Sequence, residues 1–211
     1  MTLSESRACR SSRFEILPRM GKQVRIVRHH IKVGLQSRRR FEERLALRFP
    51  ALVGPLGRCV WRLPRRSRLR GALLRHFVRL AYEAGNRHDF EAMTLLFHEA
   101  GEFVPPAEFA GLGIRRARGR EQRIEAQREW HQVWDDFRME PEQIIEFDDR
   151  LIVVGRISGS GLASGVEIGN EWGEVLDIRD GRIIREGVLF SHAALLETAG
   201  LSGYLVAAGG V

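Results

Sequence analysis

Alternating apolar and polar residues mark the segment from Val166 to Phe190 as a pair of strands. Apolar residues recur there with a period of two, which predicts a strand with one buried and one exposed face. They are Val166, Ile168, Trp172, Leu176 and Ile178. Asp180-Gly181 follows, and this dipeptide between two such runs predicts a tight hairpin turn. The return strand is expected to bury Ile184, Val188 and Phe190 on the same face.

Two carboxylates interrupt the predicted buried face of this hairpin. Glu174 stands between Trp172 and Leu176, and Glu186 lies on the return strand. A carboxylate on an apolar face is costly unless it is paired or protonated. The hairpin is therefore the predicted floor of a pocket, and Glu174 and Glu186 are its acid–base candidates. A bulge between Gly169 and Gly173 would reverse this assignment, because one inserted residue swaps the two faces.

Helical periodicity precedes the strands. A first helix is predicted from about Arg70 to Gly85-Asn86, and Asp89 is the expected cap of a short second helix. Tyr82 falls away from the apolar face of the first helix, so we expect it at the surface or at a subunit contact. That apolar face consists of Leu73, Phe77, Leu80, Ala81 and Ala84.

A third helix is predicted over residues 120–136, with Trp130, Trp134 and Phe137 at the centre of one face. Such a face either packs in the core or walls a ligand cavity. His131 lies on its flank and is a third catalytic candidate, or else a hydrogen-bonded residue at the rim. The candidates for ligand contact are aromatic: Phe103, Phe109, Trp130, Trp134, Trp172 and Phe190.

The order of predicted elements is helix, short helix, strand, glycine-containing loop, helix and several long antiparallel strands. This order favours an α+β domain over residues 71–200. A cone-shaped, curved antiparallel sheet wrapped around helices is an economical way to bury the tryptophans.

Charge divides the chain into two parts. The net charge of +7 combines 19 Lys+Arg against 4 Asp+Glu in residues 1–70 with 15 against 23 in the remainder. High charge with little to bury favours disorder, so residues 1–70 are predicted to be a disordered, Arg-rich extension. A basic arm for nucleic acid, a transit peptide, and contact with a membrane surface or with the acidic domain remain alternatives. The Gly/Ala-rich residues 201–211 are expected to form a flexible tail.

The remaining composition narrows the class of protein. Cys9 and Cys59 show no spacing typical of a zinc site, so we expect no metal and no cofactor. No apolar run reaches the length of about 18 residues that a membrane span needs. A cytoplasmic protein without membrane contact is expected, and nucleic acid is a possible partner only through residues 1–70.

Several motifs resemble those of a known superfamily over about residues 71–200. The sequence is similar to the nuclear transport factor 2-like superfamily, most closely to its SnoaL-like polyketide cyclase group and more distantly to ketosteroid isomerase. The matching motifs are Gly85-Asn86-Arg87-His88-Asp89-Phe90, Pro105-Pro106, Gly111-Leu112-Gly113, Arg118-Gly119-Arg120-Glu121, Trp130, Trp134-Asp135-Asp136-Phe137, Arg179-Asp180-Gly181-Arg182-Ile183 and Ala193-Ala194-Leu195-Leu196-Glu197.

The resemblance implies a site inside the cone. Enzymes of this group often carry an acidic residue at the position that Glu174 occupies here. The base and tyrosine positions of ketosteroid isomerase fall at about Pro105 and at Ala81, neither of which can do that chemistry. Steroid isomerisation by that constellation is therefore not expected. Domains of this kind commonly pair through the outer face of the sheet, so we expect a homodimer.

The predicted pocket and the resemblance together lead to two hypotheses about function. The first is an enzyme in which burial raises the pKa of Glu174, so that it acts as a general acid or base on an apolar carbonyl-bearing or cyclic compound, as an isomerase, cyclase or hydrolase. The second is a non-catalytic ligand-binding or dimerisation domain. An arginine within salt-bridge reach of Glu174 would favour the second, and a cavity without such a cation would favour the first.

Overall fold

The computed structural model of the protein describes residues 27–34, 38–106, 115–190 and 195. None of the helices in these ranges combines the length and apolar character that crossing a bilayer requires. The elements in chain order are β1 (Val27–His30), α1 (Phe41–Arg48), the short 3₁₀ helix η1 (Pro50–Leu52), α2 (Val53–Arg62), α3 (Arg68–Asn86), α4 (Phe90–Met93), β2 (Phe97–Val104), β3 (Ala117–Arg118), α5 (Arg120–Gln132), β4 (Trp134–Phe147), β5 (Arg150–Gly161), β6 (Glu167–Arg179) and β7 (Arg182–Leu189).

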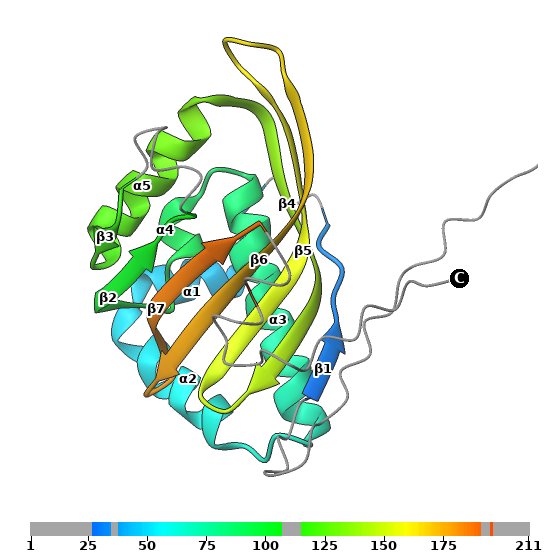
Figure 1. Cartoon of the computed structure of the whole chain (residues 1–211). Coiled ribbons are helices and arrows are strands. Elements are labelled where there is room, and N and C mark those ends of the chain that lie inside the picture. The colour runs from blue at the N-terminus through cyan, green and yellow to red at the C-terminus, as the bar shows by residue number, and fades with distance from the viewer. Residues whose placement is uncertain (1–26, 35–37, 107–114, 191–194, 196–211) are drawn as a thin grey trace, which may run out of the picture.

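One curved, unclosed sheet organises the domain. Within the described ranges it has seven strands, in the order β1-β4-β5-β6-β7-β2-β3. Neighbouring strands are antiparallel, except that β2 and β7 run parallel. The helices gather on one side of the sheet, with α3 running behind its central strands (Figure 1). The predicted α+β fold, a curved sheet wrapped around helices, is confirmed.

The β6–β7 hairpin sets the orientation of the predicted pocket floor. The register of β6 against β5 is continuous from Glu167 to Asp177, so no bulge reverses its faces. Trp172, Glu174 and Leu176 are all buried, as predicted, whereas Val166, predicted on the same buried face, lies before β6 and is 61% exposed. At the turn, Asp180 and Gly181 adopt positive φ angles of 51° and 73°, the backbone that Asp-Gly favours.

The return strand departs from the prediction at one position. The pairing shifts between Asp177 opposite Arg185 and Ile178 opposite Ile183, so an extra residue is accommodated at Ile184. This β-bulge changes which side chain points inward. Ile183, and not Ile184 as expected, packs in the main hydrophobic core.

Helix α3 confirms the first predicted helix but buries more of its surface than expected. It ends at Asn86, whose side chain holds the backbone of Met139 through hydrogen bonds of 2.8 and 2.9 Å. Tyr82 is only 5% exposed, so its predicted surface position is wrong. The reason is that Leu74, Val78 and Tyr82 form a second stripe at a spacing of four, which packs in the core on the concave side of the sheet.

Helix α5 is shorter than predicted. It ends at Gln132, and Trp134 and Phe137 belong to strand β4. Their spacing of three fits a helix and does not fit the period of two of a regular strand. A register shift between Asp135 and Arg138, with Asp136 at a φ of 51°, lets both aromatic residues pack on the same side. Phe109 and residues 201–211 lie outside the described residues.

The basic N-terminal extension is ordered over residues 27–34 and 38–70, so the prediction of disorder is wrong for these ranges. Strand β1 pairs with β4, and α1 is held by the ion pair of Glu43 with Arg87 and by two arginines just before the helix. Arg39 pairs with Asp89 at 2.6 Å, and Arg40 pairs with Glu83 at 3.0 Å. These arginines satisfy buried carboxylates that the domain could not leave unpaired. Residues 1–26 lie outside the described part.

Helix α2 is fixed across one end of the sheet by Arg70. Its guanidinium donates to Glu146 at 2.7 Å and to the carbonyl oxygens of Trp61 and Leu63 at 2.5 and 2.8 Å. Because Glu146 is fully buried, this charge-assisted contact replaces its lost hydration. Earlier in α2, a Cβ atom placed on Gly57 would lie 2.2 Å from the carbonyl oxygen of Gly181. The helix thus sits directly on the β6–β7 turn.

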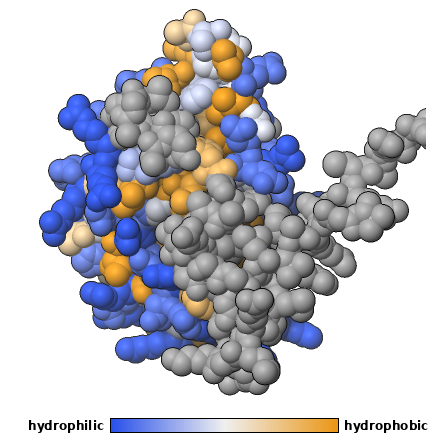
Figure 2. Space-filling view, in the orientation of Figure 1, coloured by the Kyte–Doolittle hydropathy of each residue, from blue (hydrophilic) through white to orange (hydrophobic). Residues whose placement is uncertain are grey.

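The outer face of the sheet is also apolar at its centre. Ile145, Ile152 and Val175 lie side by side on β4, β5 and β6, and Leu195 packs against them. In the view of Figure 2, apolar residues gather over the strands while hydrophilic residues occupy the margins. Part of this outer surface is therefore already covered within a single chain.

Candidate functional site

Two cavities meet inside the cone at the same two side chains. The larger has a volume of about 100 Å³ and lies between the sheet and helices α2, α3 and α4. The smaller, of about 50 Å³, lies between the sheet and α5. Glu174 and Arg123 line both cavities. The candidate site is therefore an interior space with one carboxyl and one guanidinium group at its middle.

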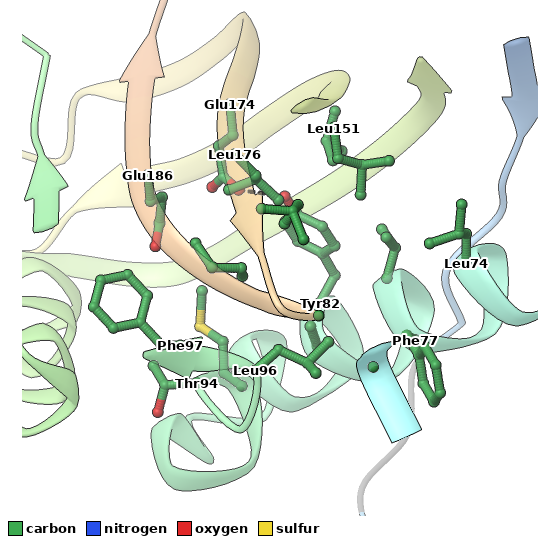
Figure 3. A pocket seen from close by; sticks show the side chains of 18 of the residues that line it. Leu74, Phe77, Tyr82, Thr94, Leu96, Phe97, Leu151, Glu174, Leu176 and Glu186 are labelled. Carbon is green, nitrogen blue, oxygen red and sulfur yellow. Dashed lines mark hydrogen bonds between the residues drawn. The ribbon is translucent and has the colours of Figure 1, made fainter. Parts of the chain in front are cut away.

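The sheet aims Glu174 into this space. It lies in β6, directly between Val153 of β5 and Val188 of β7, so its immediate neighbours in the sheet are apolar. The hydroxyl of Tyr82, from α3, donates a hydrogen bond of 2.6 Å to Oε2 of Glu174 (Figure 3). The Tyr82 ring packs edge-on against Trp172, with 5.3 Å between ring centroids. Both side chains of the hydrogen bond are thus held by packing.

This environment changes how Glu174 titrates. Burial raises the pKa of Glu174 from 4.5 to about 8, and the negative charge of Glu186 adds to the shift. The hydrogen bond from Tyr82 and the charge of Arg123 act in the opposite direction. Burial also raises the pKa of Tyr82 well above its ordinary value, so Tyr82 remains a donor. At neutral pH the pair holds two protons on neighbouring oxygens.

Glu186 has a different partner from that of Glu174. Arg123, on α5, binds both of its carboxylate oxygens at 2.5 and 2.9 Å, and Arg123 also donates to Gln127 at 2.6 Å. Burial alone would lower the pKa of Arg123, but the charge of Glu186 more than offsets this and the pKa is raised. The ion pair is bidentate and buried, a geometry that fixes both side chains.

Among the described residues, Arg123 is the arginine that lines both cavities together with Glu174. Glu174 makes no ion pair there, and its hydrogen bond comes from Tyr82. Arg123 is near enough to lower the pKa of Glu174, but it donates its hydrogen bonds to Glu186 and Gln127. Glu186 is therefore a salt-bridged carboxylate, and Glu174 is a buried carboxyl group that is bonded to a tyrosine in cavities that Arg123 also lines.

His131 lies apart from both cavities. It is 7% exposed and packs against the rings of His88, Phe90 and Phe137. Its Nδ1 lies 2.9 Å from the backbone carbonyl of Gln127, so that nitrogen carries the proton and donates. Burial lowers the pKa of His131 to about 4, so the ring is neutral at neutral pH.

The predicted aromatic ligand contacts gather mainly around the smaller cavity. Phe103, Trp130, Trp172 and Phe190 line it. Trp134 lines neither cavity and packs against Trp130, with ring centroids 5.2 Å apart. Phe109 lies outside the described residues. No set of three or more His, Cys, Asp or Glu side chains in the described ranges is arranged to hold a metal ion.

Sequence reasoning missed much of the larger cavity. Tyr82 and Arg123 are its polar members besides the two carboxylates and Thr94, and α2 contributes Val60 and Trp61. One usable signal was the spacing of four from Leu74 to Tyr82, and another was the polar series Arg123, Gln127 and His131 on α5. No local pattern in the basic extension indicated that it reaches the cavity.

Comparison with known proteins agrees with this geometry. A family model described as a SnoaL-like domain matches residues 78–186, just over half of the chain. No match was found among curated proteins. Among solved structures, TerC is 23% identical over 58% of this chain and 94% of its own, with a TM-score of 0.50. A nuclear transport factor 2-like protein of unknown function from Burkholderia pseudomallei is 20% identical over 58% and 93%, with a TM-score of 0.51.

A third neighbour, a nuclear transport factor 2-like protein from Burkholderia thailandensis, is 23% identical over 60% of this chain and 94% of its own, with a TM-score of 0.50. At these identities the structural neighbours establish the fold, a curved sheet over helices shared across nearly their whole length. The match over residues 78–186 establishes more, because it includes the strand of Glu174, the helix of Arg123 and the turn of the hairpin. The chain belongs to the family of SnoaL-like domains.

Proposed function

We propose that this protein binds an apolar, carbonyl-bearing small molecule in the cone and acts on it by acid–base chemistry through Glu174. The observation that carries the proposal is a buried carboxyl group that lines both cavities, has no ion pair among the described residues and accepts a hydrogen bond from Tyr82. The substrate class follows from the lining, which is apolar and aromatic around one acidic pair.

The chemistry follows from the protonation states. With a pKa of about 8, Glu174 is mainly protonated at neutral pH and can donate a proton to a carbonyl oxygen. Tyr82 also stays protonated and can share in stabilising the negative charge that develops on that oxygen. Polarisation of the carbonyl group acidifies the adjacent C–H bond. Water that enters the cavity with the ligand takes that proton while Glu174 protonates the oxygen, which gives the enol, and the reverse steps return both protons. Glu186 holds Arg123 in place, and His131 takes no part.

The tyrosine of this mechanism is not at the position that the resemblance implied. The resemblance to ketosteroid isomerase placed that residue at Ala81, but it is the next residue, Tyr82, that bonds to Glu174. The position matched to the base holds Pro105, so the proposal uses no base from that strand. TerC was co-crystallised with polyporic acid. This supports the proposal that a domain of this fold encloses a small molecule.

The test combines ligand capture with proton exchange. Native mass spectrometry of the purified full-length protein is expected to reveal a retained small molecule. That molecule and a panel of apolar cyclic ketones are then incubated in D₂O, and exchange of protons next to the carbonyl is followed by NMR. Glu174→Gln should abolish exchange while ligand retention and fold persist. Glu167→Gln, an exposed change on the same strand, should leave exchange intact. Unchanged exchange in Glu174→Gln would refute the mechanism.

A non-catalytic binding domain is the second candidate. It is favoured by the closure of the polar network, in which Glu186, Arg123, Gln127 and Tyr82 all find partners inside the chain. In that case Glu174→Gln should leave ligand binding unchanged and be neutral or mildly stabilising, because it removes a buried ionisable group that no chemistry needs.

We also propose that the protein forms a homodimer through the outer face of the sheet. The apolar row of Ile145, Ile152 and Val175 supports this, although Leu195 covers part of it. Because a two-fold interface meets its own copy, the margins around Leu195 would have to be self-complementary. Sedimentation of the full chain at tens of micromolar tests the proposal, and a single monomeric species there would refute it.

A further inference from the structure

Large apolar side chains are exposed together on α1, η1 and α2. Five of the nine exposed large apolar residues in the described part of the chain fall within this short segment. Scattered exposed leucines are ordinary, but a cluster of this kind marks a contact surface. Their exposed fractions are 69% for Phe41, 45% for Leu45, 49% for Phe49, 54% for Leu52 and 58% for Leu56.

The same residues border an apolar groove. It has a volume of about 200 Å³ and runs between the α1–η1–α2 segment and helices α3 and α4. Leu45, Phe49, Leu52 and Leu56 line it. The groove adjoins the larger cavity of the site, because five residues line both: Gly57, Phe77, Ala81, Met93 and Leu96.

Positive charge accompanies the apolar surface. On α1, Arg44 and Arg48 are exposed on the same helical face as Phe41 and Leu45. Arg58 and Arg62 are exposed on α2, on a different face of that helix from Leu56. None of these four arginines makes an ion pair with another described residue, unlike Arg39, Arg40 and Arg70 of the same segment.

Acidic side chains do not balance this charge. Glu43 is buried and paired with Arg87, and Glu42 lies near His76 at 3.4 Å. Exposed leucines and phenylalanines beside unpaired arginines form the surface typical of helices that lie in the boundary of an anionic bilayer. The arginines contact lipid phosphates there, and the apolar side chains enter the acyl region.

We propose that the α1–η1–α2 segment docks the protein on the surface of an anionic lipid bilayer. A second copy of the chain fits this surface less well, because a two-fold contact would bring unpaired arginines against each other. Nucleic acid would pair with the arginines but would leave Leu45, Leu52 and Leu56 exposed. Only a partner that is both anionic and apolar covers both kinds of side chain.

Docking in this orientation turns the groove toward the lipid. An apolar ligand dissolved in the bilayer then reaches the cavity of Glu174 by passing beneath α2, without crossing water. This route rests on the proposed function, whereas docking itself does not. Vesicle binding without added ligand therefore tests docking alone, and the proton-exchange result for Glu174→Gln is independent of it.

The experiment is flotation of the full-length protein with two kinds of vesicle. One is phosphatidylcholine alone, and the other contains about 30 mol% phosphatidylglycerol. Binding is expected to the second and to weaken as salt rises from about 0.05 to 0.5 M. The double variant Leu52→Ser/Leu56→Ser should lower the partition coefficient about tenfold or more. Arg44→Glu/Arg48→Glu should abolish the preference for anionic vesicles.

Matched controls lie on the far β5–β6 hairpin. Leu162→Ser/Val166→Ser removes two apolar side chains that are 67% and 61% exposed, and Arg156→Glu reverses an exposed charge. Both should bind vesicles as the wild type does, and unchanged thermal unfolding shows that each variant is folded. The proposal is overturned by three results: no binding to anionic vesicles, equal losses in test and control variants, or a dimer in sedimentation that Leu52→Ser/Leu56→Ser dissolves. Binding to RNA or DNA that these leucine changes leave intact, with no binding to vesicles, overturns it in favour of nucleic acid.

Discussion

Two buried carboxylates on one hairpin have opposite surroundings. Glu186 on β7 binds a buried arginine with both oxygens, and Glu174 on β6 accepts a hydrogen bond from a tyrosine. Each is 5% exposed, so burial does not separate them. The difference is the cation, since a paired carboxylate keeps its charge in the interior and an unpaired one takes up a proton.

The contrast assigns different tasks to the two sides of the cavity. The Glu186–Arg123 side is a fixed charge pair that links α5 to the sheet. The Glu174–Tyr82 side is a protonated pair facing apolar space, with the pKa of Glu174 raised to about 8. The negative charge of Glu186 also helps to keep Glu174 protonated, while the positive charge of Arg123 acts in the opposite direction.

The largest expected effect on stability comes from removing the ion pair between Glu186 and Arg123. Arg123→Met leaves Glu186 buried without its cation and should lower the free energy of unfolding by about 3–5 kcal/mol, measured by urea denaturation. Arg128→Met on the same helix breaks only exposed ion pairs, with Glu91 and Glu125, and should cost less than about 1 kcal/mol. Equal losses in the two variants would mean that the buried ion pair stabilises the fold no more than the exposed ones do.

The second largest expected effect is a pH dependence of the free energy of unfolding that is caused by Glu174. In the native state Glu174 holds a proton that the unfolded chain releases above pH 4.5, so stability falls as pH rises toward 8. Between pH 6.5 and 8 the wild type should lose about 1.6 kcal/mol of stability, because the slope falls from its limit of about 1.4 kcal/mol per pH unit to half of that at pH 8. Glu174→Gln should remove this loss. An identical pH profile for the variant would contradict the assignment.

His131 titrates in the opposite sense and must be separated from Glu174. Its lowered native pKa of about 4 means that the unfolded chain binds an extra proton below pH 6.5, so stability falls as pH falls. The two effects oppose each other between pH 4.5 and 6.5. In the Glu174→Gln background, His131→Gln should remove a loss of about 1–2 kcal/mol between pH 6.5 and 5. If the double variant lost the same stability between pH 6.5 and 5, groups other than His131 would be its cause.

The smallest effect concerns the hydrogen bond itself. Tyr82→Phe keeps the ring against Trp172 and removes the donor to Glu174, which should cost about 1 kcal/mol of stability. Because the bond from Tyr82 lowers the pKa of Glu174, the variant should raise that pKa further. A pKa that falls instead would show that Tyr82 does not act on Glu174.

Short-range patterns predicted the floor of the site well. The Asp-Gly turn fixed the hairpin, and the alternation on β6 placed Glu174 inward, because the period of a strand needs only a few neighbouring residues. The bulge at Ile184 was invisible to the same reasoning, since a shift in pairing depends on the partner strand.

Long-range contacts account for what the sequence did not reveal. Tyr82 is buried because its stripe of α3 packs against the sheet while α1 and α2 occupy other faces of the helix. Helix α1 is held by the ion pair of Glu43 with Arg87, and the end of α2 by Arg70, which also pairs with Glu146; the members of these ion pairs are 44 and 76 residues apart. No window of the sequence contains both members of such a pair, so a strongly basic segment looked disordered.

The pKa of Glu174 in the folded protein tests the central claim most directly. The carboxyl carbon of Glu174 can be followed by ¹³C NMR in protein labelled at glutamate, with Glu174→Gln identifying the resonance. The account predicts a midpoint near pH 8, about three to four units above a free side chain. A midpoint near pH 4 would mean that Glu174 is ionised at neutral pH, and would contradict the proposed acid.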